Sequence, residues 1–332
     1  MARMKVVVTD FIEDSLDWEA KELAQAGLDL ASFQLKFKAD DEVLAAIGDA
    51  DIIVVNMLKM TESILSRLPR CRLLIRHGIG YDNVDVAACT KHGIPFAYQP
   101  DYCTEDVAEH AIALLLACGR KVPSSRAILE RSVAKGQWDF AGLFPLYRMQ
   151  GKTLGIVGVG RIGSRVAQKL ASFGFRILGN DPYLGAERKE ELGLEWVDQE
   201  TLFRESDFVS IHTPLNDETR HIVNDRTLGL MKRTAFLVNT ARGGMVDVAA
   251  LAAALSAGAL AGAALDVYDR EPPPPEFPLY GMGNVILTPH TAWASEESGW
   301  QIRKNIVEDI LETARGGQPR SLVNKGVRVR AR

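Results

Sequence analysis

The sequence is poor in cysteine and has no long hydrophobic run. Its four cysteines form no C-x-x-C pair, which argues against a zinc ribbon or a dithiol redox site and fits a reducing cytoplasm. No apolar stretch approaches the roughly 18–20 residues that span a bilayer. The first ten residues lack the apolar core of a signal peptide. We therefore expect a soluble cytoplasmic protein that does not enter a membrane and holds no metal.

The chain also lacks a strong excess of either charge. Its 39 basic and 43 acidic residues give a formal net charge of −4, which argues against a nucleic-acid or membrane-surface binder. One local exception is the C-terminal tail, whose basic residues are Arg320, Lys325, Arg328, Arg330 and Arg332. We expect a solvated or loosely docked end there rather than a phosphate-binding arm.

What the 332 residues do contain is a nearly continuous alternation of short apolar runs with helical patterns. The runs are continuous rather than alternating, which is typical of parallel strands buried on both faces. The length favours two domains of α/β class. Expected strands lie at 5–9, 51–55, 73–75, 95–97, 153–157, 176–181, 208–212, 235–239, 262–266 and 285–287.

Two long helices are expected, at 104–119 and near 295–315. Thr104 is a good N-cap for the first, and Glu105 and Asp106 suit the positive first turn. The segment 133–150, with scattered aromatics, glycine and proline, predicts a loop.

A dinucleotide-binding motif follows the strand at 153–157. Gly158, Gly160 and Gly163 form a G-x-G-x-x-G at the start of a helix, the context that this otherwise weak motif requires. These glycines allow a tight turn, a close approach to a pyrophosphate and helix-on-strand packing. The next strand ends at Asp181, whose carboxylate suits the adenosine ribose and repels a 2′-phosphate. The sequence therefore predicts NAD as the cofactor.

Three further strands are each followed by an unusual polar residue. Arg242, Glu271 and His290 lie in these segments, and ligands of open α/β sheets bind beyond the strand carboxyl ends. Arginine suits a substrate carboxylate, and histidine titrates near neutrality. A glutamate bonded to the imidazole would fix its tautomer and favour its charged form. Taken singly, Arg242 could form a salt bridge, Glu271 could be a solvated loop carboxylate and His290 could be structural. Together they can converge with the nicotinamide, and they provide the cation and the proton donor that reduction of a 2-oxo acid needs.

These motifs, in this order, resemble those of the D-isomer-specific 2-hydroxyacid dehydrogenases. The matching stretches cover nearly the whole chain: 78–85, 107–110, 158–163, 212–215, 240–244, 266–272 and 288–290. The resemblance implies that Arg242, Glu271 and His290 are catalytic. It also implies a cofactor site lined by Gly158, Gly160, Arg161, Ile162, Gly163, Asp181, Thr213, Thr240, Ala241, Arg242 and Asp266.

The resemblance further implies two doubly wound parallel-sheet domains. A Rossmann cofactor domain, residues 102–295, would be inserted into a split flavodoxin-like substrate domain, residues 1–101 with 296–332. Domain closure would exclude water from the site. A homodimer formed through the cofactor domain is also expected.

The substrate side is less defined. Main-chain amides of Gly78, Ile79 and Gly80 are candidates for a second carboxylate cradle, and Trp293 either lines the pocket or packs at a helix start. A tryptophan three residues after His290 resembles the family branch that contains the C-terminal binding protein corepressors. This similarity keeps open the alternative that the protein is an NAD-responsive regulator with little turnover. A formate dehydrogenase would call for an amide at position 271. Weaker pocket candidates are Arg76, His77, Tyr81 and Tyr102, and the remaining histidines are interpreted as structural.

Overall fold

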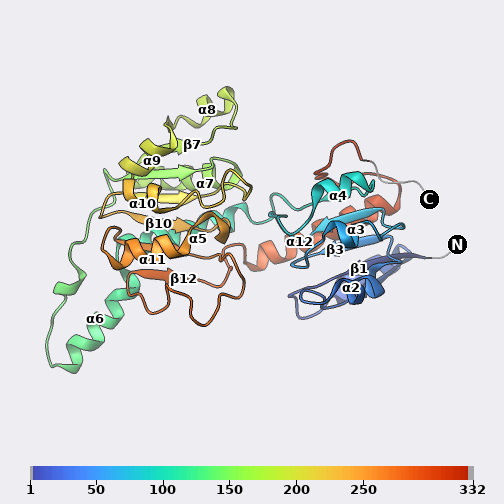
Figure 1. Ribbon diagram of the computed structural model, residues 1–332, viewed down its shortest axis with the longest axis horizontal. Helices are drawn as coiled ribbons and strands as arrows, with labels where there is room; N and C mark the ends of the chain where they lie inside the picture. The colour runs from blue at the N-terminus through green and yellow to red at the C-terminus, as the bar shows by residue number, and fades with distance from the viewer. Residues whose placement is uncertain (1–2, 328–332) are drawn as a thin grey trace. The chain divides into compact units, whose positions relative to one another are not determined.

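The structure is a computed structural model that describes residues 3–327, and it consists of two compact α/β units. One unit contains the described residues up to Tyr102 together with those from Ser295 onward, and the other is Cys103–Ala294 (Figure 1). No helix in the described part of the chain is both long and apolar enough to cross a membrane.

The first unit is built on five parallel strands in the order β2-β1-β3-β4-β5. The strands are β1 (Met4–Val8), β2 (Leu28–Ser32), β3 (Ile52–Val55), β4 (Leu73–Arg76) and β5 (Phe96–Ala97). The helices are α1 (Asp17–Gln25), α2 (Asp40–Ile47), α3 (Glu62–Leu65), α4 (Val86–Lys91) and α12 (Glu296–Ala314). Side chains of α1 and α12 share one apolar cluster with the sheet, and those of α2, α3 and α4 share the other, so helices cover both faces.

The second unit carries seven parallel strands in the order β12-β11-β10-β9-β6-β7-β8. They are β6 (Thr153–Val157), β7 (Arg176–Asn180), β8 (Glu195–Trp196), β9 (Phe208–Ile211), β10 (Phe236–Asn239), β11 (Gly262–Leu265) and β12 (Val285–Leu287). The order reverses between β6 and β9, as in dinucleotide-binding sheets. The predicted fold class, two doubly wound parallel sheets, is confirmed.

Helices also cover both faces of the larger sheet. They are α5 (Thr104–Gly119), α6 (Val122–Ala134), α7 (Arg161–Leu170), α8 (Ala186–Leu192), α9 (Gln199–Glu205), α10 (Asp225–Leu230) and α11 (Val248–Ser256). Side chains of α5 and α7 share one apolar cluster, and those of α9, α10 and α11 share the other.

Several local predictions were incomplete or wrong. Strands β2 and β8 were not predicted, and α6 includes Val133 and Ala134, which were assigned to a loop. Thr104 is the first helical residue of α5 rather than its cap, and the capping position is Cys103, whose side chain makes no capping hydrogen bond. In the tail, Arg320 pairs with Asp309 of α12 at 3.2 Å. Arg328, Arg330 and Arg332 lie outside the described residues.

Candidate active site

The carboxyl ends of the parallel strands meet at one edge of the larger sheet, and the predicted cofactor and catalytic residues lie there. Gly158 follows β6, Asp181 follows β7, and the segments that begin at Thr240, Asp266 and Thr288 follow β10, β11 and β12. Ligands of such sheets bind in the crevice outside this edge, where the strand order reverses.

The glycine-rich turn after β6 is tightly constrained at two of its three glycines. Gly158 has a φ of 84°, and a Cβ there would lie 2.7 Å from the Thr213 amide nitrogen. A Cβ on Gly163 would lie 2.1 Å from the Gly158 carbonyl oxygen. These two positions therefore fix the turn and set α7 against β6.

Gly160 differs, because a Cβ there would have no protein atom within 4 Å. The residue sits at the N-cap of α7, where the first main-chain N–H groups, those of Arg161, Ile162 and Gly163, begin the helix. Open space in front of a helix N-terminus suits an anionic group such as a pyrophosphate. The residues present therefore fit a dinucleotide.

Asp181 is held beside this turn. One oxygen of its carboxylate accepts a hydrogen bond from the Val159 amide at 3.0 Å, and the other accepts one from the Tyr183 amide at 3.1 Å. The Tyr183 hydroxyl bonds to Glu218, which brings a second carboxylate to the loop after β7. This region is therefore acidic.

The turn after β10 is shaped by Asn239, whose side chain is fully buried. Its Oδ1 accepts the Ala241 amide at 3.0 Å, and its Nδ2 donates to the Arg242 carbonyl at 2.8 Å. Within the described part of the chain, the buried Thr240 hydroxyl has no hydrogen-bond partner. A buried polar group without a partner is costly, so Thr240 fits a turn built to receive a ligand atom.

Arg242 is carried close to the segment after β11. A Cβ on Gly243 would lie 1.9 Å from the main chain of Tyr268, so glycine is needed for this approach. The Arg242 guanidinium donates to the Ala241 carbonyl at 2.9 Å. Its positive charge also contributes to lowering the pKa of Glu271.

Glu271 and His290 form a direct pair, with Glu271 Oε2 2.7 Å from His290 Nδ1. The other oxygen, Oε1, accepts the Tyr268 amide at 3.1 Å. Burial raises the pKa of Glu271, but the hydrogen bond and charge of His290, the Tyr268 amide and Arg242 together leave that pKa below its usual value. The carboxylate is therefore ionised at neutral pH, and Nε2 is the imidazole nitrogen left for proton exchange.

The main chain at His290 is left-handed, with a φ of 58°. Its amide donates to the Asp266 carbonyl at 2.8 Å and to the Thr288 carbonyl at 3.1 Å. A residue other than glycine in this conformation costs about 1–2 kcal/mol, and such backbone persists where its surroundings hold it. The segment after β12 is thus folded so that it presents His290.

Asp266 is the main anchor of this segment. Its fully buried carboxylate accepts the Thr291 and Ala292 amides, both at 2.9 Å, and the Thr288 hydroxyl at 2.6 Å. The sequence predicted Asp266 as a cofactor-site residue. The structure shows a further role that this prediction missed: the Asp266 carboxylate holds the segment around His290.

The proposed carboxylate cradle, Gly78 to Gly80, belongs to the other unit. Gly78 has a φ of 146°, and a Cβ there would lie 2.7 Å from a guanidinium nitrogen of the buried Arg76. Arg76 donates to the His77 carbonyl and to Asn56 Oδ1. A buried cation directly under a glycine loop suits an anionic ligand.

His77 follows β4 and pairs with Glu13, with 3.1 Å between His77 Nε2 and Glu13 Oε1. Burial raises the pKa of Glu13, but the hydrogen bond and charge of His77, with local main-chain bonds, bring it down to about 2. Sequence reasoning missed Glu13, because nothing in its local pattern distinguishes it from a solvated loop carboxylate.

The aromatic pocket candidates, Tyr81, Tyr102 and Trp293, lie in different surroundings. The Tyr81 ring packs edge-on against Phe96 and Tyr98 at 5.6 and 5.3 Å, and Tyr102 packs against the apolar cluster of its unit. Trp293 lies in the turn just before the capping residue of α12. Among residues 3–327, no group of three or more His, Cys, Asp or Glu side chains could hold a metal ion.

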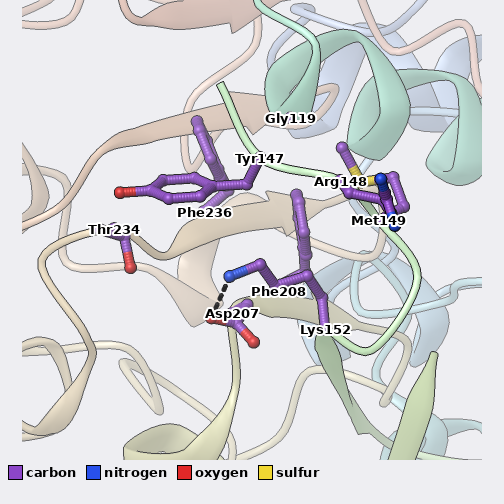
Figure 2. A pocket seen from close by; sticks show the side chains of 9 residues that line it. All are labelled: Gly119, Tyr147, Arg148, Met149, Lys152, Asp207, Phe208, Thr234 and Phe236. Atoms are coloured by element: carbon purple, nitrogen blue, oxygen red, sulfur yellow. Dashed lines mark ion pairs between the residues drawn. The ribbon is translucent and has the colours of Figure 1, made fainter. Parts of the chain in front are cut away.

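A small cavity lies in the unit Cys103–Ala294, close to the amino ends of strands β6, β9 and β10. Its volume is about 10 Å³, and it is lined by Phe208, Phe236 and neighbouring residues (Figure 2). That is room for about one water. Lys152 and Lys232 pair there with Asp207, which also accepts the Thr153 amide and joins β9 to β6. The arrangement serves the sheet rather than a substrate.

Comparison with known proteins places these features in a family. Residues 112–292 match the model of the D-isomer specific 2-hydroxyacid dehydrogenase, NAD binding domain. A glyoxylate reductase of Korarchaeum cryptofilum is 41% identical over 290 residues, which cover 86% of each chain. A D-3-phosphoglycerate dehydrogenase of Methanocaldococcus jannaschii is 38% identical over 328 residues, or 97% of this chain but only 59% of that protein.

A solved structure agrees over the full length. The NADPH-dependent glyoxylate/hydroxypyruvate reductase from Sinorhizobium meliloti, in complex with NADP and malonate, superposes with a TM-score of 0.87 at 29% identity. The alignment covers the whole of both chains.

Proposed function

The chain belongs to the D-isomer-specific 2-hydroxyacid dehydrogenases, oxidoreductases that use a nicotinamide cofactor, and from this premise we propose that it reduces a small 2-oxo acid to the D-2-hydroxy acid with NADH. The observation that carries the proposal is the Glu271–His290 pair, bonded at 2.7 Å at the ligand-binding edge of the sheet with Arg242 in electrostatic reach. The identities of the curated relatives make glyoxylate the first substrate to test.

Arg242 would bind the substrate carboxylate. A guanidinium presents two parallel N–H donors that match a carboxylate and hold it in one orientation. The same cation would polarise the adjacent carbonyl. In the same unit, we propose Trp293 as a wall for the substrate side chain. In the other unit, we propose the amides of Gly78, Ile79 and Gly80, above the buried Arg76, as donors for a carboxylate.

His290 would supply the proton. A nicotinamide held at the glycine-rich turn would supply the hydride for C2 of the substrate. As negative charge develops on the carbonyl oxygen, His290 Nε2–H donates its proton, the C2–O group becomes a hydroxyl, and the imidazole takes a proton back from water. Glu271 stabilises the imidazolium before transfer and fixes Nδ1 as the nitrogen facing it. In the oxidative direction the same imidazole would act as base.

We assign NAD rather than NADP to the cofactor site. Two main-chain N–H groups hold the Asp181 carboxylate beside the glycine turn. The Tyr183 hydroxyl holds the Glu218 carboxylate at the same loop. These two negative charges would favour the ribose diol of NAD and would repel the 2′-phosphate of NADP. The turn residues from Gly158 to Gly163, with Thr213, Thr240 and Ala241, would line the rest of the site.

The test is the rate of NADH consumption by the purified protein with glyoxylate, pyruvate, hydroxypyruvate, phenylpyruvate and 4-methylthio-2-oxobutyrate, repeated with NADPH. We expect robust turnover of at least one acid and a preference for NADH. Tight NADH binding with negligible turnover of every acid would instead support a regulatory NAD-responsive protein. Faster turnover with NADPH would contradict the assignment at Asp181.

We also propose that two copies of the chain associate through α6 and the loop that follows it. This segment extends away from the sheet of its unit (Figure 1) and exposes apolar side chains: Val122, Leu129, Val133, Trp138, Phe140, Phe144 and Tyr147. Large apolar side chains left exposed along one segment are typical of interaction sites in soluble proteins. A second copy of the chain is the occupant that the family resemblance implies.

A further inference from the structure

His110 of α5 reaches the anchor of the His290 segment, although the sequence alone classed it as a structural histidine. Its Nε2 lies 3.2 Å from the Thr288 hydroxyl and 3.6 Å from Asp266 Oδ1. The Thr288 hydroxyl itself lies 2.6 Å from the same Asp266 oxygen. The side chains of His110, from α5, and Thr288, after β12, therefore both lie close to one carboxylate oxygen of Asp266, after β11.

The directions of these hydrogen bonds follow from chemistry. Asp266 as a carboxylate only accepts, so the Thr288 hydroxyl donates its single proton to Asp266. The Thr288 oxygen can then only accept from His110, so Nε2 must carry a proton. His110 is thus a donor to the pair formed by Thr288 and Asp266.

Donors matter at Asp266 because its carboxylate is fully buried. A buried charge is tolerated when hydrogen bonds replace the lost water. The same carboxylate accepts the Thr291 and Ala292 amides, on the two residues after His290, and its main-chain carbonyl accepts the His290 amide. What stabilises Asp266 therefore stabilises the left-handed main chain at His290.

The placement of α5 allows this contact. Ala108 and Ala111, on either side of His110, are buried in one cluster with Val238 of β10 and Ala264 of β11. Their small side chains let the helix lie close to the strands. The His110 ring can then reach the strand ends.

We propose that His110 is a positioning residue for the acid/base His290: its Nε2–H donor, acting through Thr288 and Asp266, holds residues 288–292 in the conformation that presents the imidazole. This inference rests on the proposed function for its kinetic consequence, but not for its structural one. The two are therefore measured separately.

The structural readout is amide hydrogen exchange of the peptide that contains residues 288–292. His110→Leu removes the donor at similar volume, and we expect faster exchange in this peptide with little change elsewhere in the unit. His110→Gln places an amide N–H close to the position of Nε2, and we expect protection to return. Unchanged exchange in His110→Leu would overturn the proposal, whether or not the protein turns over any 2-oxo acid.

The kinetic readout uses the best substrate of the wild-type protein. A displaced catalytic group commonly costs about 100-fold, so His110→Leu should lower kcat by roughly 10- to 100-fold while the Kd for NADH stays within about threefold. His110→Gln should restore kcat to within about threefold. A Gln variant as slow as the Leu variant would contradict a role for the donor.

Thr288→Val supplies an independent variant, because it removes the hydroxyl between His110 and Asp266; on its own it should also speed exchange in the 288–292 peptide and lower kcat. Where both single variants fold, the double variant with His110→Leu should be no slower than the slower single variant, because both break one connection. Fully multiplicative losses would contradict action through Thr288. His221→Asn, an exposed histidine in the same unit, is the control and should behave as wild type.

Discussion

At the scale of single residues, the site depends on charges held in fixed directions. Glu271 is ionised because its hydrogen bonds and nearby positive charges outweigh its burial, and its Oε1 is fixed by the Tyr268 amide. The carboxylate therefore faces His290 in one orientation. A loop glutamate becomes a useful partner only because these neighbours remove its freedom.

His212 follows β9 at the carboxyl-end edge of the larger sheet, and it predicts a pH dependence of the free energy of unfolding. Burial lowers the pKa of His212 to about 4, and its Nε2 is 2.8 Å from the Ser210 hydroxyl. In the unfolded chain the group protonates near pH 6.5. Between pH 6.5 and 4 the unfolded state therefore binds more protons, so stability falls as the pH falls, by up to about 3 kcal/mol.

His212→Gln removes this titration, so the free energy of unfolding of the variant should vary less between pH 7 and pH 4.5 than that of wild type. Denaturant unfolding at both pH values measures the difference. Because carboxylates titrate in both proteins, only the difference between the proteins is diagnostic. Identical pH dependence would show that the folded protein does not hold His212 in its neutral form.

How far the sequence specifies the site also differs residue by residue. Arg242, Glu271 and His290 could be chosen because each follows a strand, and strand ends converge in this fold. The contributions of Thr288 and His110 could not be chosen in the same way. They act through hydrogen bonds between segments up to 178 residues apart, which no local pattern encodes.

At the scale of an element, two glycines of the turn between β6 and α7 have different roles: Gly160 is expected to matter for cofactor binding and Gly163 for stability. Gly160 faces open space, whereas a Cβ on Gly163 would meet the Gly158 carbonyl at 2.1 Å. We therefore expect Gly160→Ala to keep the unfolding midpoint of wild type but to weaken NADH binding by at least about tenfold. Gly163→Ala should instead lower stability by about 1–3 kcal/mol, the usual cost of overpacking.

Thermal unfolding and NADH titration of both variants check this pair. Each variant is the control for the other, since both add one methyl group to the same motif. Loss of stability in Gly160→Ala with unchanged NADH affinity would contradict the placement of the pyrophosphate at this turn.

The elements that the sequence did not reveal share a physical reason. Strands β2 and β8 lie at sheet edges, where burial is partial and the continuous apolar signal of a central strand is lost. Helix α6 has a single buried residue, Ser132, so it lacks the apolar stripe that marks a helix packed on a core. Central strands, by contrast, were found to within about a residue or two.

At the scale of the whole molecule, the exposed segment after α5 predicts self-association. Trp138 is 78% exposed, a large loss of hydrophobic stabilisation unless another surface covers it. Sedimentation of the wild-type protein should give the mass of two chains, and Trp138→Ser combined with Phe140→Ser should shift it toward one. Phe37→Ser, at a residue 79% exposed in the other unit, is the matched control and should leave the mass unchanged.

A wild-type mass of one chain at micromolar concentration would contradict this prediction. So would a dimer that survives the double substitution unchanged. The composition could not have shown this surface, because the same aromatic residues would be ordinary in a core.

The central claim is that His290 exchanges the proton in reduction of a 2-oxo acid, and one measurement tests it most directly: kcat with NADH and the best substrate for His290→Asn against wild type. Asparagine tolerates the left-handed main chain found at His290. His221→Asn is the matched control, because His221 also has a positive φ, of 50°, in the same unit. We predict a loss of about 10²- to 10⁴-fold for His290→Asn, with NADH affinity within about threefold of wild type and no loss in the control. Full turnover by His290→Asn would contradict the account.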